Sequence, residues 1–234
     1  MAKGIMILEN ISKEYQKDKK KIQVFNNMNY SFDEGVFYCI KGKSGIGKTT
    51  LIEILALIKS QTNGEYYIYG TNTKKMSEDD KAKMRNKKIG FIFQDFRLIP
   101  TMTVIENVLL PIYTKKISWK KKTELADKVI KIVGLENRKN HYPKELSGGE
   151  QQRAAIARAL INSPSIILAD EPTGSLDEKN SIEILSILKK ISTLNKCVIV
   201  VSHDKIIDNF ADVILCLERK NLQLANIRKN EGYI

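Results

Sequence analysis

The sequence contains the loop Gly42-Lys43-Ser44-Gly45-Ile46-Gly47-Lys48-Thr49 between two segments of different character. The apolar residues 36–40 before it predict a strand, and residues 50–59 after it predict a helix. The pattern of Gly, four residues and Gly-Lys-Thr in this context is typical of a loop that wraps around a polyphosphate. The alternative is a glycine-rich turn without a ligand, and the agreement of pattern and context speaks against it.

Each residue type in this loop has a physical reason. Glycines let the backbone approach phosphates closely, where a β-carbon would clash, so that successive N–H groups form an anion-binding nest. The N-terminus of the following helix adds positive potential. Lys48 is expected to reach the β- and γ-phosphates, and the Thr49 hydroxyl to ligate Mg²⁺. The nucleotide-binding residues predicted here are Gly42, Lys43, Ser44, Gly45, Ile46, Gly47, Lys48, Thr49 and Thr50.

The composition predicts one soluble globular domain. The chain has 234 residues, of which 42% are hydrophobic and 28% charged, and we expect a single domain over residues 1–234. No apolar run approaches the roughly 20 residues that span a bilayer. Residues 1–5 lack the apolar segment of a signal peptide. The expected location is therefore the cytosol, and any role at a membrane requires a partner on another chain.

The chain is strongly basic, with a net charge of +12 and lysines concentrated in residues 17–21 and 120–122. Three interpretations stay open, namely a nucleic-acid surface, attraction to an anionic membrane face, and a solvated surface without a specific partner. The last is favoured. No aromatic residue interleaves with these lysines as it would in a stacking platform for single strands.

Closely spaced strands are predicted in the N-terminal third, around residues 4–11, 22–25, 29–32 and 65–69. They suggest an antiparallel layer beside the nucleotide site. Tyr15 follows the first of them, and two roles stay open for it: stacking on a purine base, or packing as an ordinary aromatic residue at a strand end.

The three cysteines, Cys39, Cys197 and Cys216, lie far apart in predicted strands and lack the spacing of metal ligands. They are expected to be reduced and buried.

Polar residues follow three predicted buried strands. Gln94 ends the strand over residues 89–94, where its amide is placed to contact Mg²⁺ or the attacking water, or to act as a plain strand cap. Asp170 and Glu171 end the apolar strand that begins at residue 165. Asp170 is placed to hold Mg²⁺ through water, and Glu171 to act as general base. His203 follows the strand over residues 197–201 and is placed to hydrogen-bond a γ-phosphate, although a lone histidine is usually structural.

A second anion-binding helix start is predicted at Ser147-Gly148-Gly149-Glu150, which opens a helix through Leu160. Ser147 suits the N-cap position, and the glycines leave bare N–H groups. Capping alone would need neither glycine. Further helices are predicted over residues 104–113 and 118–133.

Taken together, these stretches resemble the nucleotide-binding domain of ATP-binding cassette (ABC) transporters, over residues 5–225. The resemblance implies an α/β fold, a P-loop NTPase with a RecA-like core, an N-terminal antiparallel β subdomain and an inserted α-helical subdomain over about residues 95–160. It rests on six ordered motifs: Tyr15 as the adenine-stacking aromatic, the loop of residues 42–49, Gln94, the signature Leu146-Ser147-Gly148-Gly149-Glu150, the strand of residues 166–171, and His203.

The resemblance implies that two copies stack head to tail with two ATP molecules and Mg²⁺ between them. Each ATP would lie on the phosphate loop of one copy and meet Ser147, Gly148, Gly149 and Glu150 of the other, with Asp177 lining the shared interface. Catalysis would rest on Glu171, His203, Gln94 and Lys48, with Thr49, Gln94 and Asp170 at the metal.

A separate integral membrane subunit is also implied, with its coupling helix near Gln94 and the helical subdomain, and Phe96, Leu98 and Ile99 as candidates for the socket or for the core. The chain would then lie on the inner face of the cell membrane. Two departures from the family pattern are Ile46, where a small residue is usual, and Glu150, where the usual residue is Gln. The first would tighten the loop, and the second would add negative charge near the partner copy's nucleotide.

Within that superfamily the chain is similar to the ATPases of lipoprotein-release, macrolide-exporter and antimicrobial-peptide-exporter systems. The stretches 90–94, 106–108, 168–174 and 202–204 carry this likeness. It implies a transport ATPase for a peptide, lipoprotein or hydrophobic drug, and the lysine-rich composition favours a bacteriocin-like peptide in a Gram-positive host. A signalling or force-transmitting subunit, as in cell division, is the alternative. A nucleic-acid ATPase is not expected, because the chain has neither a long coiled-coil insertion nor a second cassette.

Overall fold

The computed structural model describes residues 4–17 and 20–227 and contains two sheets. The larger sheet has the strand order β10-β9-β3-β8-β7-β6, with parallel pairing from β9 to β6. Its strands are β3 (Phe37–Lys41), β6 (Ile89–Ile92), β7 (Ile166–Asp170), β8 (Cys197–Val201), β9 (Val213–Glu218) and the antiparallel edge strand β10 (Asn221–Ile227). The parallel strands are almost uninterrupted runs of apolar residues because both faces of the sheet are covered.

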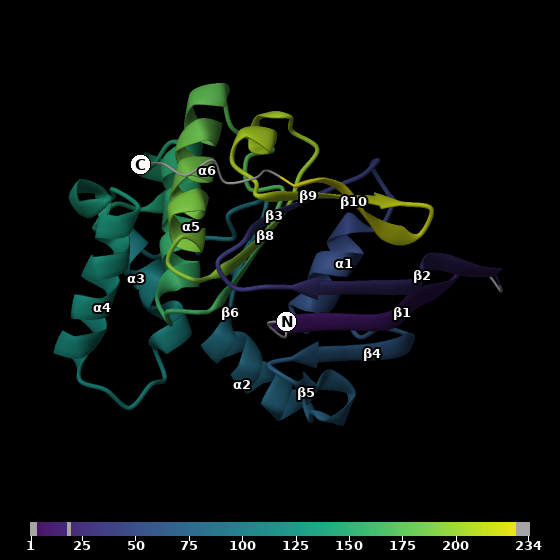
Figure 1. Cartoon of the computed structure of the whole chain (residues 1–234). Helices are drawn as coiled ribbons and strands as arrows, with labels where there is room; N and C mark the ends of the chain where they lie inside the picture. Colours follow the sequence, from purple (N-terminus) through teal and green to yellow (C-terminus); the bar gives the residue numbers. More distant parts are fainter. Residues whose placement is uncertain (1–3, 18–19, 228–234) are drawn as a thin grey trace.

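The smaller sheet is antiparallel, with the order β2-β1-β4-β5. It consists of β1 (Met6–Lys17), β2 (Lys20–Phe32), β4 (Asn63–Ile68) and β5 (Thr71–Asn72). Figure 1 shows it beside α1 (Lys48–Leu55), on the opposite side of the larger sheet from the main group of helices. The antiparallel N-terminal layer that the sequence predicts is therefore present.

The other helices are α2 (Glu78–Lys88), α3 (Val104–Leu109), α4 (Trp119–Ile132), α5 (Gly148–Leu160) and α6 (Glu178–Ser192). Short 3₁₀ turns lie at Thr73–Lys75, Leu110–Ile112, Glu136–Arg138, Pro143–Glu145 and Ile206–Asn209. Within residues 4–17 and 20–227, no helix has the length and apolar character needed to cross a bilayer.

Alternate residues along the central strands point to opposite faces of the sheet and pack in two separate hydrophobic cores. In β7, Ile167 and Ala169 pack with α3 to α6, whereas Ile166 and Leu168 pack with α1 and the antiparallel sheet. This follows from the two-residue period of a strand. The sheet therefore separates α1, which begins at the phosphate loop, from α5, which begins at the signature stretch.

Several local predictions are wrong. The helix after the phosphate loop ends at Leu55 rather than at residue 59, because Leu57 takes a left-handed φ of 59° and the chain turns away. The segments 22–25 and 29–32 form the single strand β2.

The cysteines lie in strands as predicted, but Cys216 is only half-buried. Residues 1–3 of the N-terminal stretch, and Asp18 and Lys19 of the first lysine run, lie outside the described residues.

Candidate functional site

The predicted catalytic groups converge at one edge of the larger sheet. The phosphate loop follows β3, Asp170 ends β7 and His203 follows β8, and these three strands are neighbours in the order β3-β8-β7. In a parallel sheet the carboxyl ends of the strands meet at a common edge, where ligands bind.

The phosphate loop leads into α1 without a side-chain cap. Gly47 precedes the helix with φ of 112°, and a β-carbon there would lie 2.3 Å from Val24 Cγ1. Only glycine fits both the conformation and the space. The Lys48 ammonium folds back and donates to the carbonyl oxygens of Gly42 (2.9 Å) and Lys43 (3.3 Å). The loop thus holds a helix N-terminus and an ammonium group together, as an anion site requires.

Thr49 and Asp170 are the residues that fit a metal ion. The Thr49 hydroxyl hydrogen-bonds the Asp170 carboxylate, while burial raises the pKa of Asp170 above its ordinary value and the neighbouring Glu171 raises it further. Asp170 Oδ1 is buried and has no hydrogen-bond partner. A hydroxyl and a buried carboxylate with a free oxygen are hard oxygen donors of the kind Mg²⁺ prefers. A cation there would stabilise the charge that burial disfavours.

Glu171 and His203 contact each other directly, with 2.7 Å between His203 Nδ1 and Glu171 Oε2. The contact is an ion pair when the imidazole is protonated, and Glu171 Oε2 is otherwise buried without a hydrogen-bond partner. Glu171 has a left-handed φ of 48°, and its N–H donates to the Val201 carbonyl (2.9 Å), which fixes it against the end of β8. The glutamate is largely buried, whereas the histidine is exposed at the rim.

Gln94 lies further along the same edge. The strand β6 ends at Ile92, two residues earlier than predicted, and Gln94 is exposed in the segment that follows. Its amide faces the turn after Glu171, where a β-carbon on Gly174 would lie 3.4 Å from Gln94 Nε2. The structure therefore places Gln94 beside the acidic turn rather than in contact with Thr49 or Asp170.

Tyr15 belongs to β1 and is half-buried next to the start of α1. Its hydroxyl lies 3.4 Å from Thr50 Oγ1, and the Nζ atoms of Lys13 and Lys59 lie 4.9 Å and 5.8 Å from its ring centre. The aromatic ring is thus at the phosphate loop, surrounded by cations.

The signature stretch differs in detail from the prediction. Ser147 caps α5 by accepting from the Glu150 N–H (3.3 Å), and Glu150 Oε2 accepts from the Ser147 N–H (2.8 Å) in a capping box. The Ser147 hydrogen bond lowers the pKa of Glu150, whose other oxygen accepts from Arg138 Nε (3.1 Å). The capping predicted for Ser147 is confirmed. The Glu150 charge, however, is engaged within its own chain.

Contacts through α5 link the signature to the acidic turn. The Gln152 amide is buried and donates to the Pro172 carbonyl (2.8 Å). Asp177 caps α6 by accepting from the Asn180 N–H (2.8 Å) and side chain (2.7 Å), and the backbone bond lowers the pKa of Asp177. Gly149 packs closely against Asn180. This packing, and not the helix cap, gives a reason for a glycine at this position.

The Gly149→Ala variant is expected to be less stable, because its β-carbon would lie 2.0 Å from Asn180 Oδ1. We expect the free energy of unfolding in urea to fall by about 1–3 kcal/mol. Gly148→Ala is the control, since its nearest neighbour would be Leu176 Cδ2 at 3.3 Å. Adding Asn180→Ala to Gly149→Ala should recover part of the loss. Equal stability of the two alanine variants would contradict the packing argument.

Sequence reasoning missed Arg158. Its guanidinium, on α5, donates to the carbonyls of Phe96 (2.7 Å) and Arg97, which both have left-handed φ angles (52° and 48°). Burial lowers the pKa of Arg158. The only signal in the sequence is a basic residue within an alanine-rich helix. Of the predicted socket residues, Leu98 packs against the core and Ile99 is exposed.

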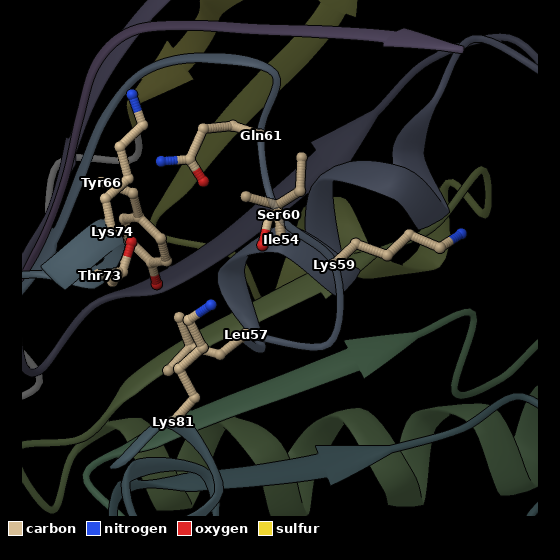
Figure 2. A pocket seen from close by; sticks show the side chains of 9 residues that line it. All are labelled: Ile54, Leu57, Lys59, Ser60, Gln61, Tyr66, Thr73, Lys74 and Lys81. Carbon is tan, nitrogen blue, oxygen red and sulfur yellow. The ribbon is translucent and has the colours of Figure 1, made fainter. Parts of the chain in front are cut away.

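A cavity away from this edge offers no alternative site. Figure 2 shows its lining side chains, which come from the end of α1 and the turn after it, from β4 and the following 3₁₀ turn, and from α2. Its volume is about 40 Å³, room for a few water molecules. Its three lysines pair with acids: Lys59 with Glu53, Lys74 with Glu65, and Lys81 with Glu78. Among residues 4–17 and 20–227, no group of three or more His, Cys, Asp or Glu side chains could hold a metal.

Known proteins are similar to this chain in sequence and in fold. The sequence profile of the family described as ABC transporter matches residues 25–174. The chain is 46% identical over 209 residues to MJ1508, an ABC transporter ATP-binding protein of Methanocaldococcus jannaschii, covering 89% of this chain and 93% of that protein. It is 42% identical over 203 residues to the lipoprotein-releasing system ATP-binding protein LolD of Francisella tularensis, covering 86% and 88%.

A solved structure extends the similarity to three dimensions. It is a dimeric, post-hydrolysis state of the ATP-binding cassette MJ0796, also from M. jannaschii, bound to ADP and Pi. The TM-score is 0.86 at 39% sequence identity, covering 97% of this chain and 100% of the other.

Proposed function

Because the chain belongs to the ABC transporter family and is an ATP hydrolase of that family, we propose that two copies bind two ATP molecules head to tail and power a membrane transporter. One observation carries the proposal. The two helix starts proposed to bind anions belong to α1 and α5, and these helices pack in separate cores on opposite faces of the larger sheet. One copy cannot bring both to the same nucleotide, so a second copy must supply the other half, as the dimer of the cassette MJ0796 suggests.

In this proposal the phosphate loop, residues 42–50, binds the triphosphate. The Lys48 ammonium exchanges its two loop carbonyls for β- and γ-phosphate oxygens. Thr49 and Asp170 would hold Mg²⁺, with the free Asp170 Oδ1 as the available ligand. When bound, Mg²⁺ neutralises charge on the phosphate oxygens. Tyr15 stacks on the adenine.

Glu171 is proposed as the general base. Its carboxylate takes the proton of the water that attacks the γ-phosphorus, as the bond to the ADP oxygen breaks. His203 contacts Glu171 through Nδ1, which leaves Nε2 to hydrogen-bond the γ-phosphate. Gln94, beside the turn after Glu171, would position the water or contact the metal once the segment moves.

The partner copy would supply Ser147, Gly148 and Gly149 to the same ATP, with Glu150 holding the helix start in shape and Asp177 at the interface. The helical subdomain over about residues 95–160 would receive a coupling helix of a separate membrane subunit, near Gln94. This arrangement puts the cassette on the cytoplasmic face of the membrane. Arg158 would position the segment through the Phe96 and Arg97 carbonyls, since it joins that segment to the signature helix.

For the transported substrate we propose a lipoprotein, a peptide or a hydrophobic drug, and the similarity to LolD supports the first. Affinity purification of the chain from its own cells, followed by identification of the membrane protein bound to it, tests this. A partner with few spans and a large outer domain would support extraction from the outer leaflet. A solute channel with many spans would contradict it.

The Lys48→Ala variant is expected to bind ATP roughly 10- to 100-fold more weakly, because charge-assisted hydrogen bonds to the phosphates are lost. Titration calorimetry with ATP and Mg²⁺ measures this. Lys75→Ala, which removes an exposed lysine outside the proposed site, is the control. Unchanged affinity in a folded Lys48→Ala protein would refute the phosphate-loop assignment.

A further inference from the structure

One exposed surface of the helical layer joins large apolar side chains to lysines. Residues 113–121 are all exposed and form the loop that leads into α4, together with the first residues of that helix (Figure 1). Tyr113 is 64% exposed, Ile117 38% and Trp119 58%. Large apolar side chains are usually buried in a soluble protein. Three exposed ones within seven residues therefore indicate a binding surface. We call it the 113–121 surface.

The charge of this surface has one sign. The sequence has no Asp or Glu between Glu106 and Glu124. Lys121 pairs with Glu124 (3.6 Å), whereas Lys115, Lys116 and Lys120 have no ion-pair partner among the described residues. The ammonium groups of these three lysines are therefore available to bind an anionic ligand.

The 113–121 surface is held in shape by its own contacts. The buried Lys122 donates to the Tyr113 carbonyl, and its Nζ lies 5.6 Å from the Tyr113 ring centre. Ser118 caps α4 by accepting from the Lys121 N–H (3.3 Å). At its base, Asn86 of α2 donates to the Pro111 carbonyl (3.0 Å). No aromatic residue lies within the second lysine run itself, but Trp119 directly precedes it, and Tyr113 lies beside it through Lys122.

We propose that the 113–121 surface binds the anionic head groups of a lipid bilayer, with Trp119, Tyr113 and Ile117 at the boundary between head groups and acyl chains. Tryptophan and tyrosine favour this boundary, and lysines beside it interact with anionic lipids. The inference goes beyond the proposed function, since this contact lies outside the nucleotide site and requires no membrane subunit.

The same features disfavour other ligands. Single-stranded nucleic acid would use a groove with stacked aromatic rings, whereas this is a projecting loop whose aliphatic Ile117 has no role in stacking. Protein interfaces are depleted in lysine, and a protein partner would have to desolvate three ammonium groups. A bilayer accepts the apolar tips while the ammonium groups stay hydrated.

Trp119 is the only tryptophan of the chain and therefore reports on this surface directly. The full chain is mixed with phosphatidylcholine vesicles with or without about 30% phosphatidylglycerol, a content that provides a negative surface potential. With the anionic vesicles we expect a blue shift of the emission and protection from iodide quenching, both reversed by high salt. An unchanged spectrum would overturn the proposal. So would an equal shift with neutral vesicles, or binding to vesicles without a change at Trp119.

Two variants of equal charge test the location of the contact. The first replaces the three unpaired lysines with Gln and keeps Trp119. We expect it to partition about ten- to a hundredfold more weakly onto the anionic vesicles. The control replaces three exposed lysines elsewhere, and should bind normally. The two sets are Lys115→Gln, Lys116→Gln and Lys120→Gln, and Lys75→Gln, Lys179→Gln and Lys190→Gln.

Equal losses in both variants would overturn the proposal in favour of general charge attraction. Tighter binding of single-stranded RNA than of anionic vesicles at the same salt would overturn it in favour of a nucleic-acid surface. ATP affinity, measured in the same preparations, should be equal in all three proteins. A failure of the nucleotide site is thereby distinguished from a failure of the lipid contact.

Discussion

The Glu171→Gln variant is expected to form a dimer that persists as long as ATP is present, and to hydrolyse ATP about 10²- to 10⁴-fold more slowly than the natural chain. Glutamine has nearly the same shape and can still lie against His203, but it cannot take a proton from the attacking water. In the proposed arrangement ATP binding joins the two copies, and this variant leaves that binding intact while it blocks the step that would separate them. Size exclusion with light scattering, in ATP and Mg²⁺, measures the dimer.

The control for this variant is Glu178→Gln, which removes an exposed acid from the start of α6. It should hydrolyse ATP at the normal rate and show no persistent dimer. A Glu171→Gln protein that binds ATP yet stays monomeric at all concentrations would refute the head-to-tail arrangement. Normal ATP hydrolysis by the Glu171→Gln variant would refute the role of Glu171 as general base but would not contradict the head-to-tail arrangement.

The groups at the carboxyl edge of the sheet are the part of the site that the sequence predicts well. Asp170 and His203 follow uninterrupted apolar runs, and such runs form adjacent parallel strands whose ends must meet. The contact between Glu171 and His203 is not predictable in the same way. It depends on the left-handed φ of Glu171, which no pattern of residues in the sequence predicts.

Predictions that depend on packing between distant segments were less accurate. Helix-forming residues continue to residue 59, yet α1 ends at Leu55 because Leu57 packs against the core with a left-handed φ. Glu150 reads as a free charge, but Arg138, twelve positions earlier, pairs with it. Gly149 reads as an anion-binding glycine, and the structure adds a second reason in Asn180. In each case the deciding contact joins residues that are distant in the sequence, and the periodicity of apolar residues carries no information about it.

The Ser147→Arg variant is expected to bind ATP with normal affinity and to lose nearly all hydrolysis. Its own phosphate loop, which leads into α1 on the other face of the sheet, is unaffected, whereas the arginine would project into the site of the partner copy. Lys48→Ala alone should also be inactive. Mixing the two variants should restore activity, because a mixed dimer combines both defects in one site and leaves the other site complete. Random pairing at equal concentrations predicts recovery of about a quarter of the normal rate.

The restored activity must come from shared sites rather than from a repaired fold, and two controls decide this. Mixing Ser147→Arg with a chain that carries both substitutions creates no complete site, so activity should stay at background. Ser147→Asp keeps an N-cap for α5, since aspartate caps as well as serine, but it would place a negative charge against the partner copy's phosphates. We expect Ser147→Asp to melt at the normal temperature and still fail to hydrolyse ATP. Full activity of either Ser147 variant alone would show that one copy completes its own site.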